Sequence, residues 1–395
     1  MKRDLSLSHY RSRYRSRSQS ASRSLLLYLS LSLLLVSAAA AGAQQAPVVE
    51  NPFEAPGRAP LLRVQTVVGD SGPDEALFYS PGHLNIGPDG TLYVTDSGNK
   101  AIHMYAPDGT FLGRIGQEGG GPGEFQMPSG SWFTPDGTLA VKDMMNQRIS
   151  YFTPDGSFLR SEPLSGSIMT SAVPEPLGED RYVNTNAGGL MVMRLEGGDR
   201  PAEPPFLEIV DGEGKRLTTF GERKPVEEPR TSMLVNSVEV AGRDGKVAAA
   251  FRNAADIRIY DATNGRLELV ITRELAFDPR EPSVEMQTRD LGEGRTGVTM
   301  VGMADPVTLD VAFDKQGRLW VLTSLFDEAG TEEKEEEGDY EGLVRMEIYG
   351  GDGKMIAAWT LEEPADTLAF APDGSLWLLD SRYTNTARRC SVRWP

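Results

Sequence analysis

The sequence repeats itself with a spacing that few folds can satisfy. A unit from Tyr79 to Phe125 contains four short apolar runs separated by turn signals, and a near copy follows directly. Asp89 and Asp136 open matching Asp-Gly turns and lie 47 residues apart. Within each unit, the two Asp-Gly turns are 19 residues apart. Because Asp-Gly between apolar runs is a strong hairpin signal, each unit is predicted to be a four-stranded antiparallel sheet.

Looser copies of the unit fill the rest of the chain, over residues 181–220, 238–271, 309–359 and 368–393. Four-stranded units with a period of about 40–50 residues are typical of β-propeller blades. The last copy lacks a fourth strand, whereas Leu61–Gly69 resembles an outer strand without the inner three. Pairing these two segments would close the ring. We therefore predict an all-β, six-bladed β-propeller over residues 61–395, in which an N-terminal strand completes the last blade.

The first 43 residues have the features of a secretory signal peptide. Basic residues precede an apolar run, Leu25–Val36, and Ala41-Gly42-Ala43 fits a cleavage site. The run is too short to span a bilayer comfortably. Cleavage would leave residues 44–60 as an N-terminal linker and no transmembrane segment in the mature chain. We expect a secreted or periplasmic protein, with retention of the apolar run as a membrane anchor as the alternative.

Charge and cysteine content restrict the partners and the source of stability. The chain has a net charge of −17, and loss of residues 1–43 removes seven basic residues and one Asp to leave −23. Such an acidic surface repels phosphate backbones, so we do not expect nucleic-acid binding. Cys390 is the only cysteine, which excludes an intrachain disulfide. We expect a monomer that depends on core burial.

Long insertions are predicted on one face of the disc. Loops between second and third strands share this face with the connections between blades, and these segments hold Thr185–Pro205, Glu274–Pro306 and Ser324–Gly342. The Asp-Gly turns of the opposite face stay short. Because insertions in repeat proteins often collect on the binding face, we expect a small-molecule ligand or a protein partner to bind this loop-rich face.

Polar residues near these loops are the candidates for binding. They begin an inner strand or follow a second strand: His83, Asp96, Asn99, Asp143, Asn146, Arg252, Asp380, Arg382 and Tyr383. In one interpretation each carboxylate caps the backbone amides of its own loop. In the other, oxygen ligands converge on a calcium ion, and the residues would be Asp96, Asp143, Asn184 and Asp380. We predict no obligatory cofactor, with calcium as the ion that these residues would suit.

The sequence offers no coherent catalytic set. His83 and His103 are the only histidines after residue 43, too few for a zinc site built from several blades. No G-x-S-x-G motif is present. Gly292–Gly297 fits G-x-G-x-x-G but has neither the strand nor the helix of a dinucleotide site. The charged run Glu332–Glu337 is predicted to be a solvated loop tip.

The first two units resemble the NHL repeat. The resemblance lies in Leu92–Asn99 between two Pro-Asp-Gly turns and in Gly-Pro-Gly-Glu-Phe at 121–125. It is weak in the third unit. NHL domains form six-bladed propellers that include ligand-binding and RNA-binding proteins and a peptidyl-hydroxyglycine lyase, so the resemblance implies fold more than function. We predict an extracytoplasmic binding scaffold rather than an enzyme. The alternative is a calcium- or zinc-dependent, lactonase-like or lyase-like enzyme.

Overall fold

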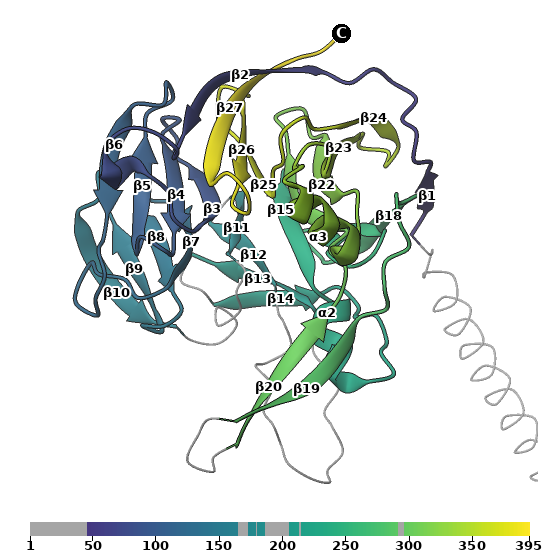
Figure 1. Cartoon of the computed structure of the whole chain (residues 1–395), viewed down its shortest axis with the longest axis horizontal. Coiled ribbons are helices and arrows are strands. Elements are labelled where there is room, and N and C mark those ends of the chain that lie inside the picture. Colours follow the sequence, from purple (N-terminus) through teal and green to yellow (C-terminus); the bar gives the residue numbers. More distant parts are fainter. Residues whose placement is uncertain (1–45, 165–172, 179, 186–204, 213–214, 291–295) are drawn as a thin grey trace, which may run out of the picture. The chain divides into compact units, whose positions relative to one another are not determined.

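Six antiparallel sheets of the computed structural model follow one another along the chain (Figure 1). The structure describes residues 46–395 except 165–172, 179, 186–204, 213–214 and 291–295. The predicted signal peptide and most of the predicted insertion 185–205 therefore lie outside the described residues. Within those residues, no helix is long and apolar enough to cross a membrane.

Each sheet is one blade, and the first strand of each blade lines the centre. Blade one contains β3 (Pro81–Ile86), β4 (Leu92–Asp96), β5 (Ala101–Tyr105) and β6 (Phe111–Ile115). Blade two contains β7 (Pro128–Phe133), β8 (Leu139–Asp143), β9 (Arg148–Phe152) and β10 (Phe158–Pro163). Blade three contains β11 (Glu175–Gly178), β12 (Arg181–Thr185), β13 (Leu207–Asp211) and β14 (Arg216–Phe220).

The second half of the chain continues the same order. Blade four contains β15 (Val238–Arg243), β16 (Lys246–Phe251), β17 (Ile257–Asp261) and β18 (Leu267–Arg273). Blade five contains β21 (Thr308–Phe313), β22 (Leu319–Ser324), β23 (Val344–Tyr349) and β24 (Met355–Thr360). Blade six contains β25 (Thr367–Phe370), β26 (Leu376–Asp380), β27 (Thr386–Arg393) and the N-terminal strand β2 (Leu61–Val68).

The N-terminal strand closes the ring, as predicted. β2 lies antiparallel to β27, with Leu61 opposite Arg393 and Val68 opposite Ala387. Figure 1 shows the earliest described strand of blade six in purple beside the last strands of the chain in yellow. The prediction of a six-bladed propeller with four-stranded antiparallel blades is confirmed.

Alternate side chains of one strand pack against different blades. On β4, Leu92 and Val94 lie in an apolar cluster with Trp377 of blade six, whereas Tyr93 lies in another with Leu139 of blade two. This follows from the alternation of side chains between the two faces of a strand. The described residues contain six such clusters, one for each pair of adjacent blades, including blades six and one.

Additional elements occur between blades and within blade five. A 3-10 turn, η1 (Asp74–Ala76), precedes blade one, and η3 (Pro229–Thr231) with α2 (Ser232–Val235) joins blades three and four. The hairpin β19 (Ser283–Asp290) and β20 (Thr296–Met303) joins blades four and five. The glycine motif predicted at 292–297 lies between these two strands in the sequence, and its residues 292–295 are outside the described residues.

The acidic run predicted to be a loop tip is instead helical. It forms most of α3 (Glu328–Glu337), between β22 and β23. Asp327 caps the first turn by accepting a hydrogen bond from the Gly330 amide at 2.8 Å, and Gly338 ends the helix with a φ of 69°. Both are common helix-end signals, so the prediction of a loop was wrong because the caps outweigh the like charges.

Residues 44–60, predicted to be a linker, include a strand that joins two blades. β1 (Val48–Asn51) lies parallel to β18 on the outer edge of blade four. The buried Asn51 side chain donates a hydrogen bond to the Gly353 carbonyl (3.0 Å) and accepts one from the Met355 amide (2.7 Å) of blade five. This segment therefore ties blade four to blade five before the chain enters blade six.

The Asn51→Ala variant should unfold more easily, because it leaves the Gly353 carbonyl and the Met355 amide without a partner. We expect a loss of about 2 kcal/mol in the free energy of unfolding and a fall of about 2–4 °C in Tm. Thermal denaturation followed by circular dichroism measures this. Glu50→Ala, an exposed neighbour on the same strand, should leave Tm unchanged. Equal Tm values for both variants would contradict the assigned role of β1.

Candidate functional site

Backbone amides of its own blade and of the segment before it donate hydrogen bonds to the Asp96 carboxylate. This carboxylate, at the end of β4, accepts hydrogen bonds from the amides of Tyr79 (2.8 Å) and Ser80 (2.9 Å), and from those of Gly98 and Asn99 (3.0 Å each). The Asn99 side chain donates a further bond at 2.9 Å. Asp96 therefore fixes the inter-blade connection and the loop after β4 in one arrangement.

Asp143 of blade two repeats this arrangement, and Asp380 of blade six repeats the part that caps the loop after the second strand. Asp143 accepts bonds from the amides of Gln126 (3.0 Å) and Met127 (2.9 Å), and from the amide and side chain of Asn146. In blade six, Asp380 accepts bonds from loop amides that include those of Arg382 and Tyr383, at 3.1 Å each. These geometries match the interpretation in which each carboxylate caps its own loop. Any further role in binding stays a prediction.

The predicted calcium ligands make hydrogen bonds within their own blades. Hydrogen bonds from N–H groups surround Asp96, Asp143 and Asp380, whereas a calcium ion requires oxygen lone pairs that are free to converge on it. Asn184 lies buried on β12, with its side-chain nitrogen 3.4 Å from the carboxylate of Glu208. Across the described residues, no group of three or more His, Cys, Asp or Glu side chains could hold a metal ion.

The central channel forms a large cavity among the described residues. It has a volume of about 1110 Å³ and is lined by residues of all six first strands. Of the predicted binding residues, His83, Arg252 and Arg382 line it. The other six lie outside its lining: Asp96, Asn99, Asp143, Asn146, Asp380 and Tyr383. Cavities of several hundred Å³ are the usual sites for small ligands, which makes the channel the candidate site.

One wall of the channel contains polar groups without hydrogen-bond partners among the described residues. They are the Nδ1 atom of His83, the Nδ2 atom of Asn85, and the hydroxyls of Ser129 and Ser131, all on β3 and β7. Burying such a group unpaired costs about 1–3 kcal/mol. Four such groups on the first strands of adjacent blades indicate a surface suited to hydrogen-bonding with a molecule in the channel. We call these four residues the polar wall.

Desolvation keeps His83 neutral. Burial, aided by the nearby Lys142 ammonium, lowers the pKa of His83 to about 4. A neutral imidazole has one nitrogen that donates and one that accepts a hydrogen bond. His83 can therefore bind a hydroxyl group at neutral pH without adding a positive charge to the channel.

Blades three to five place carboxylates on the opposite side. Glu175 of β11, Glu239 of β15 and Asp310 of β21 all line the channel, and we call them the acidic wall. Glu239 forms an ion pair with Arg252, and Asp310 accepts a bond from the Leu368 amide at 2.8 Å. The sequence prediction missed all three, although each is the only acid in its first strand.

Glu175 differs from the other two acids because no described residue pairs with its side chain. Burial, and then the charge of Glu239, raise the pKa of Glu175 to about 7. Burial also raises the pKa of Asp310, and Glu239 and Glu175 add to the shift. A carboxylate held in this way gains the most from a cation that enters the channel.

The loop-rich face is braced around the mouth of the channel. Tyr383 stacks on Tyr340, with ring centroids 4.7 Å apart. The guanidinium of Arg382 lies 3.8 Å from the carboxylate of Glu335 on α3. The helix therefore joins blade five to blade six at the end of the channel where Arg382 lies.

Known proteins resemble the chain at the level of fold. The family model described as a 6-bladed beta-propeller, DUF5128, matches residues 72–287, more than half of the chain. A solved structure from the duf4221 family of Bacteroides vulgatus is similar with a TM-score of 0.54 and 9% identity, covering 86% of this chain and 99% of that one.

A second similar structure is that of a Bacteroides fragilis protein described as exported. Its TM-score is 0.52 and its identity 11%, and the match covers 88% of this chain and 100% of that one. At such identities the likeness shows the fold alone. No curated protein matches the sequence. The family match agrees with six blades and does not test the NHL resemblance.

Replacing Asp96 by Ala should destabilise the fold, because four backbone amides would lose a charged acceptor. We expect a loss of about 3 kcal/mol in the free energy of unfolding, since hydrogen bonds to charged groups contribute about 1.5–3 kcal/mol each. Urea denaturation measures the change. Asp108→Ala removes an exposed turn carboxylate of the same blade and should cost less than about 1 kcal/mol. Similar losses in both variants would rule out the capping role.

Proposed function

The chain belongs to the DUF5128 family of six-bladed β-propellers, and we propose that it is an extracytoplasmic binding protein that takes a small, hydroxylated amine into its central channel. One observation carries this proposal. Unpaired polar groups line one side of the channel, and a carboxylate without a partner among the described residues lies on another. Buried polar groups without partners are costly, and apolar side chains at these positions would avoid that cost.

Export and NHL-type repeats are parts of this proposal. The basic and apolar segments of residues 1–43 support export, as does the name of the similar Bacteroides fragilis protein. The paired turns and the Asp-Asn caps of blades one and two support NHL-type repeats.

The acidic wall favours a cationic group on the ligand. Glu175 and Asp310 are both held toward their neutral forms by burial and by Glu239. A protonated amine between them would offset the repulsion among these carboxylates and supply hydrogen-bond donors. Arg252 already neutralises Glu239, so Glu175 is the acid most available to an incoming cation.

The polar wall favours hydroxyl groups on the same ligand. His83, Asn85, Ser129 and Ser131 together offer donors and acceptors. These groups suit an uncharged polyol, because each hydroxyl can both donate and accept hydrogen bonds. An amino polyol therefore matches both walls, with its amine at Glu175 and its hydroxyls at β3 and β7.

His83 and the three acids of the acidic wall lie toward the loop-rich face. His83 is opposite Thr95 near the start of β3, Glu239 is opposite Ala250 near the start of β15, and Asp310 is opposite Leu322 in the first half of β21. The second strands in these pairs end at the loops of this face. A ligand would thus enter beside Arg252 and Arg382, which also line the channel.

Glucamine, an amino polyol, should bind to the purified protein, and sorbitol, which lacks the amine, should bind at least about tenfold more weakly. Isothermal titration calorimetry compares the two. Glu175→Gln keeps the shape of the side chain and removes its charge, so it should lower the affinity for glucamine about tenfold or more. Glu50→Gln, an exposed acid far along the chain from the channel, serves as the matched control. Equal affinities for glucamine and sorbitol would refute the proposed role of the acidic wall.

Stability should depend on pH through Glu175. Its pKa rises from an ordinary value of 4.5 to about 7 on folding, so the folded state holds a proton that the unfolded state has released. The stabilisation by this proton is present at low pH and is lost as the pH rises from about 4.5 to 7.

Other charged groups lie in the same part of the channel, namely Glu239, Asp310 and Arg252. The comparison between wild type and Glu175→Gln therefore isolates the contribution of Glu175 to the pH dependence of stability. Melting temperatures from pH 5 to 8 should fall more for the wild type than for this variant. Parallel profiles would show that Glu175 is not held neutral by the fold.

A further inference from the structure

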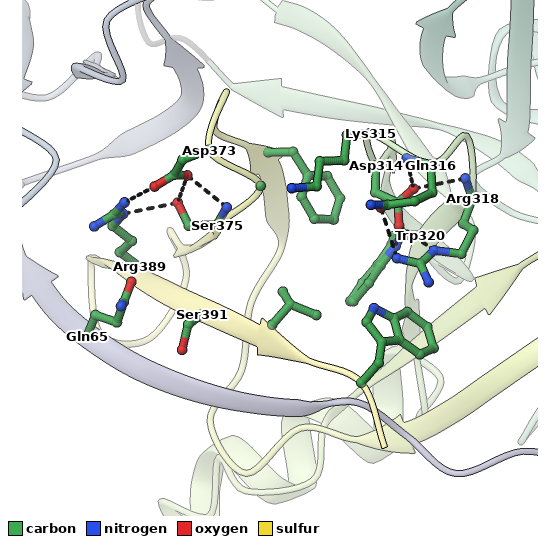
Figure 2. Close-up of a pocket in the computed structure, with 14 residues that line it drawn as sticks. Gln65, Asp314, Lys315, Gln316, Arg318, Trp320, Asp373, Ser375, Arg389 and Ser391 are labelled. Atoms are coloured by element: carbon green, nitrogen blue, oxygen red, sulfur yellow. Dashed lines mark hydrogen bonds and ion pairs between the residues drawn. The ribbon is translucent and has the colours of Figure 1, made fainter.

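A second cavity lies at the turn ends of blades five and six, on the face opposite the long loops. Its volume is about 410 Å³. The turn between β21 and β22 forms one side, the turn between β25 and β26 forms another, and the outer strands of blade six complete it (Figure 2). We call it the turn-face pocket. Its volume lies within the range of small-molecule sites.

Asp314 fixes the inner end of the turn-face pocket. Its carboxylate accepts hydrogen bonds from the indole N–H of Trp320 at 2.9 Å and from Nε of Arg318 at 2.6 Å, and Figure 2 shows both converging on it. The amides of Gln316 and Arg318 donate to the same carboxylate at 2.9 and 3.0 Å. With all of these bonds made, Asp314 is a structural anchor and offers little attraction to a ligand cation.

Aromatic rings supply an apolar surface. Trp320 is fully buried and packs edge-on against Phe370 (5.2 Å between centroids) and Trp394 (6.2 Å). The guanidinium of Arg318 lies 3.8 Å from the centre of the Trp394 ring. This stacking holds a partly exposed indole at the rim of the pocket without filling the cavity. Such surfaces bind flat rings well.

One cationic side chain of the pocket, Lys315, has no ion-pair partner among the described residues. Arg389 donates to Asp373 and to the Ser375 hydroxyl, and Arg318 is paired with Asp314. Lys315 forms no hydrogen bond or ion pair with any other residue in the described part of the chain. In Figure 2 its side chain extends from its own turn toward the turn that carries Asp373.

A glycine leaves the space that the Lys315 ammonium occupies. A Cβ atom at Gly374 would lie 2.9 Å from Nζ of Lys315, and the φ of Gly374 is +87°, which favours glycine. The ammonium is thus an unpaired positive charge beside an apolar surface, in a chain whose net charge is −17. It will attract an anion locally because the neighbouring acids are already paired.

We propose that the turn-face pocket binds a carboxylate-bearing ring compound, with the carboxylate at Lys315 and the ring against Phe370 and Trp394. The site differs from the channel in the residues that complete its lining. Lys315 and Phe370 line both cavities, whereas Trp394 lines only the turn-face pocket and Glu175 lines only the channel. These two residues allow separate tests of the two sites.

Sugar acids and aromatic acids both present a ring and a carboxylate, so galacturonate and benzoate are the probes. Each is titrated into the full-length protein by calorimetry, next to its neutral counterpart, galactose or benzyl alcohol. We expect at least one acid to bind, at least about tenfold more tightly than its counterpart. Binding of only one acid would support the proposal and identify its source. No binding of either acid, or equal binding of acid and neutral compound, would overturn it.

Variants assign the bound acid to this pocket. Lys315→Met should weaken its binding about tenfold or more, and Lys315→Arg should largely retain it. Trp394→Leu should also weaken it, whereas Glu175→Gln should not. Lys315 is exposed, so Lys315→Met should keep the wild-type circular dichroism spectrum and Tm. Unchanged binding in Lys315→Met would refute the site. Glucamine binding that survives in Trp394→Leu would show that the channel works independently.

Discussion

The whole structure depends on the burial of every blade on both faces. A four-stranded sheet that packed on one side only would expose the other, and no blade here has enough residues to fold around itself. Leu92 and Tyr93 show the solution, since adjacent residues of one strand enter the cores of two different interfaces. Each blade is therefore stabilised by both neighbours. The central channel is the space that the six first strands enclose.

The same constraint explains which features the sequence could predict. Turn chemistry and period are local, so Asp89, Asp136 and their neighbours were enough to predict blades, and the unpaired Leu61–Gly69 segment was enough to predict closure. The caps were also local. Asp96 and Asn99 lie three residues apart and bind each other in the folded protein. By contrast, α3 was missed although Asp327 and Gly338 mark its ends, because the charged run between them dominated the interpretation.

The channel could not be predicted in the same way. Glu175, Glu239 and Asp310 lie on three blades, and each is the only acid of its strand. They come together only because the first strands of all blades surround the central axis. A single sequence does not show which side chains of a first strand face that axis. Lys315 was obscured for a similar reason. It lies in one of the short turns of the repeat, and the space for its ammonium group is left by Gly374 on another blade.

The pairing of β2 with β27 also imposes an order of events on folding. Five complete blades lie between β2 and β27 in the sequence, so the outer strand of blade six waits for its partner until all of them have been synthesised. Contacts between such distant segments carry a large loop-closure entropy and slow the final step. Until then β2 offers an unpaired edge that can associate with other chains. A protein of this design therefore benefits from staying unfolded until both β2 and β27 are available to pair.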